Sequence, residues 1–265
     1  MAQLKGPLQF TGSIGNFRSY YDKRLKRYIL STKGGASREL ILNSPEFERT
    51  RENMKDFAAC SMWASLLRKA LLCVAALYRG NYFSNIVKYG KNIQKFDTVN
   101  IKGKRSVASS MASHLLKLIN FNEDQPFSMA FCNPVKVVFS DDKKRVTLQI
   151  SDFQSYGQLH WISPFQSYRF TLVIAQLADM VWNETELKYL PIVKGLEHLT
   201  VTTVSDWQNR ITDKIEVNLE ASFAAPALQQ LGTTVVVVMG IEFRDAQPNN
   251  ITLGGTMGIV ECFVE

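Results

Sequence analysis

The sequence predicts an α+β protein in which an N-terminal β-hairpin and helical bundle precede an antiparallel β-sandwich. Three patterns lead to this fold class. Aromatic and β-branched segments flank a polar turn near the N-terminus, apolar residues recur at helical spacing from residue 45 onward, and strict alternation begins near residue 135. We expect two domains, a basic hairpin and helical domain over residues 1–125 and an acidic β-sandwich domain over residues 126–265.

The first expected element is a hairpin. Residues 16–21 and 27–32 carry aromatic and β-branched side chains on either side of a charged turn, which is typical of paired strands. Glycines bound the segment on both sides, where the backbone needs conformational freedom. A two-stranded hairpin alone is marginally stable in water, so we expect this one to pack against another surface.

Three helices are expected next. Ser44-Pro45-Glu46 is typical of a helix start, and it predicts a long helix from Pro45 to about Arg79 that ends at Gly80. A shorter helix is predicted over residues 81–96, with a weak point at a glycine, and a third over residues 105–119. The third helix has an expected inner face formed by Val107, Met111, Leu115, Leu118 and Ile119. Short connections between the three favour a small bundle.

The second half of the chain predicts strands. Residues 135–139 and 146–150 alternate between apolar and polar around a charged turn, which indicates a second hairpin. Five further strands are expected at residues 168–177, 200–204, 211–223, 233–243 and 257–264. Regular strands separated by turn residues favour an antiparallel sandwich.

The charge of the chain is divided between its two halves. The formal charge is +7 overall, but residues 1–120 carry 21 basic and 7 acidic side chains, and residues 121–265 carry 10 basic and 17 acidic ones. Opposite charges of +14 and −7 allow copies to associate head to tail, and such contacts close into rings or continue as filaments. From charge alone, a monomer whose halves neutralise each other is an equal alternative.

Composition and cysteine use restrict the class of protein. A chain of 265 residues with 46% hydrophobic content is neither disordered, collagen-like nor a disulfide scaffold. Cys60, Cys73, Cys132 and Cys262 lack paired spacing and are expected to be buried thiols in a reducing compartment. No secretory signal and no membrane-spanning run is visible, so we expect a cytoplasmic location or one within an assembled particle.

Motifs that carry chemistry are not found. His114, His160 and His198 are isolated in sequence and have no metal-ligand spacing, and no nucleophile elbow or phosphate-binding loop is present. We therefore predict no catalytic residue, no cofactor and no metal site, and a protein that is not an enzyme. An enzyme whose site is assembled from distant residues would need a pocket that unites a histidine with a carboxylate.

The candidate site is the basic and aromatic segment of the first hairpin. Its cations and tyrosines are suited to contact phosphates while stacking on bases, or to contact another protein chain. The residues are Arg18, Tyr20, Tyr21, Lys23, Arg24, Lys26, Arg27 and Tyr28. The alternative is a solvated hairpin tip whose tyrosines pack on the helices.

Several segments resemble a known group of proteins. Gly12-Ser13-Ile14-Gly15, the string Ser-Pro-Glu-Phe-Glu-Arg-Thr-Arg-Glu-Asn at residues 44–53, and an all-β second half are similar to uncharacterised proteins from Bacteroidota-type bacteria. This resemblance implies kinship without an activity, a cofactor or a catalytic residue. A basic strand pair followed by an arginine-containing helix and β-domains also resembles small structural proteins of phage-like particles.

Two hypotheses follow. The first is a non-enzymatic structural subunit that self-assembles into a phage-like particle, shell or filament through its hairpin and the sandwich edges. Its partners would be further copies of the chain or other particle subunits. The alternative is a nucleic-acid or anionic-polymer binding protein that uses the same basic segment.

Overall fold

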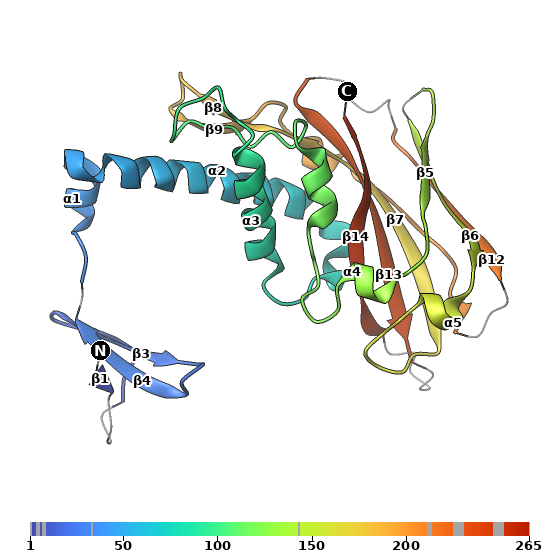
Figure 1. The fold of residues 1–265 in the computed structure, drawn as a ribbon, viewed down its shortest axis with the longest axis horizontal. Coiled ribbons are helices and arrows are strands. Elements are labelled where there is room, and N and C mark those ends of the chain that lie inside the picture. Colours follow the sequence, from blue (N-terminus) through green and yellow to red (C-terminus); the bar gives the residue numbers. More distant parts are fainter. Residues whose placement is uncertain are drawn as a thin grey trace. The chain divides into compact units, whose positions relative to one another are not determined.

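The computed structural model describes residues 2–3, 6, 9–32, 34–142, 144–210, 214–224, 231–245 and 252–264. It confirms the α+β class, with helices and antiparallel sheets (Figure 1). The chain divides into two compact units, Met1–Arg51 and Glu52–Glu265. This division differs from the expected one at residue 125, because the helices after residue 52 share a hydrophobic core with the strands.

The N-terminal unit contains a four-stranded antiparallel sheet in the order β1-β4-β3-β2. The central hairpin is the predicted one, and the two outer strands are short. The strands are β1 (Ala2–Gln3), β2 (Gly12–Ile14), β3 (Phe17–Asp22) and β4 (Arg27–Thr32). In the turn, the Asp22 carboxylate accepts hydrogen bonds from the amides of Arg24 and Leu25, each at 2.9 Å. Lys26 then adopts a left-handed φ of 49°, so the chain can reverse.

The long helix predicted from Pro45 to Arg79 is interrupted. A short helix α1 (Arg38–Asn43) and the turn η1 (Pro45–Phe47) precede α2 (Glu48–Ala70), and η2 (Leu72–Leu77) follows it. The Ser44 side chain makes no capping hydrogen bond, although proline does occupy the first position of η1. The backbone leaves the helical region at Leu71 and Val74, both of which are buried in the core. Packing against the sheet therefore overrides helix propensity.

The second predicted helix is confirmed as α3 (Tyr82–Gln94). Gly90 lies inside it and permits close packing, since a Cβ there would lie 3.0 Å from the Trp63 ring. The third predicted helix is wrong over its first half, because only η3 (Ser113–Leu118) is helical. Of its expected inner face, Val107 and Ile119 are buried, whereas Met111 and Leu118 are exposed.

Long-range hydrogen bonds explain why residues 105–112 are not helical. The Asp97 carboxylate accepts from the amide of Ser106 at 2.7 Å, and the Asp179 carboxylate accepts from the amide of Ser110 at 3.0 Å. Between them, Val107 exchanges two backbone hydrogen bonds with Met180, at 2.8 and 3.1 Å. Backbone groups that a helix would use are thus bound to other parts of the chain.

The second unit contains the predicted sandwich of two antiparallel sheets. The larger sheet has the order β10-β7-β13-β14, with β11 also paired to β7, and the smaller has the order β12-β6-β5. The larger sheet consists of β7 (Ser167–Ala178), β10 (Val201–Val204), β11 (Gln208–Asn209), β13 (Thr233–Arg244) and β14 (Thr252–Val264). The smaller consists of β5 (Lys136–Phe139), β6 (Arg145–Phe153) and β12 (Ile215–Ser222). Residues 211–213 of one predicted strand lie outside the described residues.

Five further short elements lie in the described part of this unit. The hairpin of β8 (Met180–Asn183) and β9 (Lys188–Pro191) was not among the predicted strands. The remaining short elements are α4 (Phe127–Ala130), α5 (Ser155–Gln158) and η4 (Leu196–His198). None of the helices in the described ranges combines the length and hydropathy needed to cross a bilayer.

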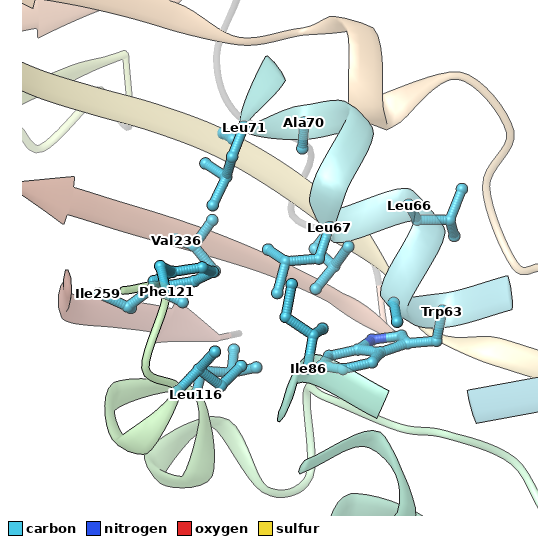
Figure 2. Close-up of a cluster of buried hydrophobic side chains, with 14 of the residues drawn as sticks. Trp63, Leu66, Leu67, Ala70, Leu71, Ile86, Leu116, Phe121, Val236 and Ile259 are labelled. Atoms are coloured by element: carbon cyan, nitrogen blue, oxygen red, sulfur yellow. The ribbon is translucent and has the colours of Figure 1, made fainter. Parts of the chain in front are cut away.

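The larger sheet is buried on both faces. On β7, Phe170, Leu172 and Ile174 contact the smaller sheet, while Val173 and Ala175 belong to the core shared with the helices. Figure 2 shows this second core, in which side chains from α2 and α3 meet side chains from β13 and β14. The unit therefore has three layers, helices, a central sheet and an outer sheet (Figure 1).

The cysteines differ in part from expectation. All four are free, and Cys60 is buried as expected. Cys73 and Cys132 are exposed, and Cys262 is intermediate. The expectation of buried thiols is therefore wrong for Cys73 and Cys132, and for Cys73 the reason is the break after α2, which turns one side of η2 away from the core.

The glycines of the central sheet provide a test of this packing. A Cβ at Gly255 would lie 2.5 Å from Leu77 and 2.2 Å from the Ile241 carbonyl oxygen. We expect Gly255→Ala to lower the free energy of unfolding by about 2–3 kcal/mol, because overpacking forces the helices off the sheet. Urea unfolding followed by circular dichroism measures this. Gly34→Ala, which meets open space, is the control, and equal effects of the two substitutions would contradict the packing.

Candidate interaction surface

The eight residues predicted as a site lie close together but do not share one face. Strand alternation and the register of β3 and β4 place Tyr21 opposite Tyr28 on one side of the N-terminal sheet. Their rings are 5.1 Å apart in an edge-to-face arrangement. Phe17 and Ile14 extend this side, with exposed fractions of 50% and 64%.

The opposite side of the same sheet is basic. Arg18 lies with its guanidinium 5.9 Å from the centre of the Tyr20 ring, and Arg27 is paired in register with Asp22. Arg27 also donates a long hydrogen bond of 3.5 Å to Gln3. The two sides of the sheet therefore differ in chemistry: the aromatic pair lies on one, and Arg18 and Arg27 lie on the other beside Tyr20 and the buried Ile29.

The turn of the hairpin carries the other three cations. Lys23, Arg24 and Lys26 are exposed at the tip. In the described part of the chain no ion pair involves these side chains or the two strand arginines. The tip thus concentrates positive charge that the described residues leave uncompensated.

The N-terminal unit has almost no core. Among its described residues only Ser19 and Ile29 are buried, and every residue of α1 is at least partly exposed. A sheet of this size needs a buried face or a packed helix for independent stability. Within the described residues of this unit, the apolar side of the sheet is therefore not covered by a core.

The edges of the sandwich were the other expected contact surface. Among the described residues, β5 and β14 are each paired with one neighbouring strand, so each lies at the edge of its sheet. They are linked by Phe139 and Phe263, whose rings stack at 4.7 Å. At the opposite side of the sandwich, Thr203 of β10 donates to the Glu220 carbonyl of β12 at 2.7 Å. The sandwich is thus tied together by side chains at both margins.

A buried carboxylate in the helical layer has a structural environment. Asp56 accepts hydrogen bonds from the Arg105 guanidinium and, at 2.9 Å, from the Gly103 amide. The Tyr189 hydroxyl lies 3.4 Å away and the Lys91 ammonium 3.7 Å away. This carboxylate therefore ties Gly103 and Arg105 of the loop to helix α2.

The thiol and imidazole groups lie in different surroundings. Burial raises the pKa of the Cys60 thiol to about 11, so it is not a thiolate at neutral pH. His114 packs edge-on against Phe96 at 5.8 Å, and His198 is exposed beside Glu197 at 3.9 Å. Within the described ranges no three metal-ligating side chains gather in one place. His160 lines a cleft whose described lining includes no carboxylate.

Searches against protein-family models, curated proteins and solved structures found no match for this chain. The interpretation of its surfaces therefore depends on their own geometry.

A second buried carboxylate yields a pH prediction. Asp179 accepts from the Ser109 and Ser110 hydroxyls at 3.1 and 2.5 Å. Burial raises its pKa more than these hydrogen bonds lower it. The folded chain therefore holds this proton more tightly than the unfolded chain, and the ionised carboxylate destabilises the fold at neutral pH.

We compare the free energy of unfolding of Asp179→Asn with that of the parent at each pH. Because the substitution removes the buried charge, we expect this difference to favour the variant more at neutral pH than at acid pH. The difference between the two free energies of unfolding should shrink as pH falls through the raised pKa, because the parent carboxyl then becomes neutral. Urea unfolding of both proteins at several pH values measures this. Asp152→Asn, at an exposed ion pair with Lys214, is the control. A difference that does not vary with pH would contradict the raised pKa.

Proposed function

We propose that this chain is a non-enzymatic structural subunit that self-associates into a phage-like particle, shell or filament. The observation that carries the proposal is the N-terminal sheet, which exposes apolar residues on one side and buries only Ser19 and Ile29 in its described part. Such a sheet gains its stability from whatever it binds. We infer that the bound surface belongs to a neighbouring copy.

Charge supports a neighbouring copy as the partner. The N-terminal unit carries ten basic and four acidic side chains, a formal charge of +6. Residues 121–265 have a net charge of −7, so the sandwich presents an excess of acidic groups. Complementary charge favours contact between the N-terminal unit of one copy and the sandwich of the next, and it opposes contact between like units.

Helix α2 adds a second apolar surface. Its inner residues, such as Trp63 and Leu67, are fully buried in the core. On its outer side Met54, Phe57 and Met62 are all exposed. A helix that is apolar on two sides is typical of one that is covered on both, and the second cover is here assigned to another subunit.

The proposed function predicts assembly in solution. We expect the purified chain to sediment as an oligomer at micromolar concentration, and the double variant Phe17→Asp, Tyr21→Asp to sediment as a monomer, since two carboxylates would oppose burial of the apolar side. Sedimentation velocity at about 0.05 M and about 0.5 M salt measures size, and electron micrographs separate rings, shells and fibres. Apolar packing should persist at the higher salt.

The control for assembly is Val99→Asp, which places the same charge at an exposed apolar side chain of the loop after α3. It should leave the oligomer unchanged. A monodisperse monomer of the parent protein at both salt concentrations would overturn the proposal.

A second candidate function is binding of nucleic acid or another anionic polymer. The observation that favours it is the cationic tip, where Lys23, Arg24 and Lys26 form no ion pair with a described residue. Nearby tyrosines could stack on bases while the cations contact phosphates.

Salt dependence tests this candidate. For a polymer binder, DNA or RNA affinity falls steeply with salt, with a slope of log K against log salt near −0.9 for each phosphate contact on duplex DNA. We expect the combined change of Arg24, Lys26 and Arg27 to alanine to flatten that slope by about two to three. The same change at the exposed lysines Lys69, Lys102 and Lys194 is the matched control. Equal effects of the two triple variants would exclude the hairpin as the binding site.

A further inference from the structure

One end of the sandwich contains a cleft. The loop from α5 to β7 and Arg210 line two open hollows of about 330 and 390 Å³, both of which include Phe165 and Arg210. Figure 1 shows this loop running past the ends of the strands. These volumes fall within the range of roughly 300–1,000 Å³ that is usual for small-molecule sites.

The wall of the cleft is held rigidly from behind. The Gln125 carboxamide donates to the His160 carbonyl at 2.5 Å and accepts from the Ile162 amide at 2.7 Å. Between these two hydrogen bonds, Trp161 stacks on Phe243 with ring centres 4.5 Å apart. A loop fixed on both sides of its central residue is preorganised, so a ligand would lose little affinity to ordering it.

An exposed guanidinium lies at the junction of the two hollows. The Arg210 side chain lies over the Phe165 ring at 5.2 Å. Its backbone amide donates to the Gln166 carbonyl at 2.6 Å, and its carbonyl accepts from the Ser155 hydroxyl. Stacking on a ring leaves the edge of a guanidinium available for hydrogen bonds in its own plane.

The charge of Arg210 is not neutralised within the described part of the chain. No ion pair there involves Arg210, and the described lining of both hollows includes no aspartate or glutamate. In the hollow of about 330 Å³, His160 and Ser163 add hydrogen-bonding side chains. Ile162 and Pro164 add apolar surface to the same hollow. The cleft is thus a positive site in a half of the chain whose net charge is −7.

We propose that this cleft binds a small organic anion that combines a carboxylate or phosphate with a compact apolar ring. The oxyanion is bound by Arg210 in the plane of its guanidinium, the geometry in which arginine binds planar anions in bidentate fashion. The ring contacts Ile162, Pro164 and the accessible edge of Trp161. This site lies wholly within the second unit and does not depend on the proposed assembly.

Titration of the full chain with benzoate, phenyl phosphate, benzamide and inorganic phosphate tests the proposal. Isothermal calorimetry and Trp fluorescence report binding. We expect saturable binding of benzoate or phenyl phosphate, with benzamide and inorganic phosphate weaker by at least about tenfold, since each lacks either the charge or the ring. The better of the two ring anions identifies the oxyanion that the site prefers.

Two variants locate the site. Arg210→Gln should weaken binding of the ring anion by at least about tenfold, because it removes the charged donor. Ile162→Glu places a carboxylate, which repels an anionic ligand, at an exposed position of the cleft. It should also weaken binding of the ring anion, without replacing Arg210. Arg145→Gln, at an exposed arginine of β6 that pairs with Glu220 of β12, is the control and should bind as the parent does.

Three results would overturn the proposal. The first is that neither ring anion shows saturable binding. The second is that a ring anion binds the parent and Arg210→Gln equally well. The third is that inorganic phosphate binds as tightly as the ring anions. Sedimentation of the same samples keeps this outcome separate from that of assembly, since a monomer that binds the ring anion at Arg210 would support the cleft and refute the proposed subunit function.

Discussion

The pairing of β7 with β13 is the interaction on which the second unit depends. Twelve residues of each strand pair in continuous register from Thr233 and Ala178 to Arg244 and Ser167. Because side chains alternate, this one ladder supplies apolar residues to two cores, one against the smaller sheet and one against the helices. Helices and outer sheet each bury a single face, so neither layer would remain packed if the central ladder were lost.

Local patterns account for the part of the fold that the sequence predicts. The first hairpin, α3 and most strands are visible because their periodicity lies within a dozen residues. The ends of the predicted helices at residues 45–79 and 105–119 are wrong for a non-local reason. Leu71 and Val74 turn inward against a distant sheet, and Asp179 binds the amide of Ser110 across 69 positions. Such contacts leave no periodic signal in the sequence.

The candidate site divides in the same way. The basic and aromatic hairpin is contiguous in sequence, and its composition alone indicates a contact surface. What the sequence does not reveal is that Tyr21 and Tyr28 lie on one side while Arg18 and Arg27 lie on the other, since this follows from register. Asp56 and Arg105 are 49 positions apart in sequence. The contacts that build the cleft join residues 35 and 55 positions apart, and only the folded chain brings them together.

The sheets of the two units differ in how much of their surface is buried, and this difference affects how each is stabilised. The central sheet of the second unit is covered on both faces by its own chain, so its strands are stable before any partner binds. The N-terminal sheet buries little beyond Ser19 and Ile29 in its described part. In the proposed assembly, the stability of this sheet is linked to the surface that it binds and rises with the concentration of that partner. Under the same proposal, the larger unit folds first and the smaller one is completed only on contact, which confines strong pairing to the assembled state.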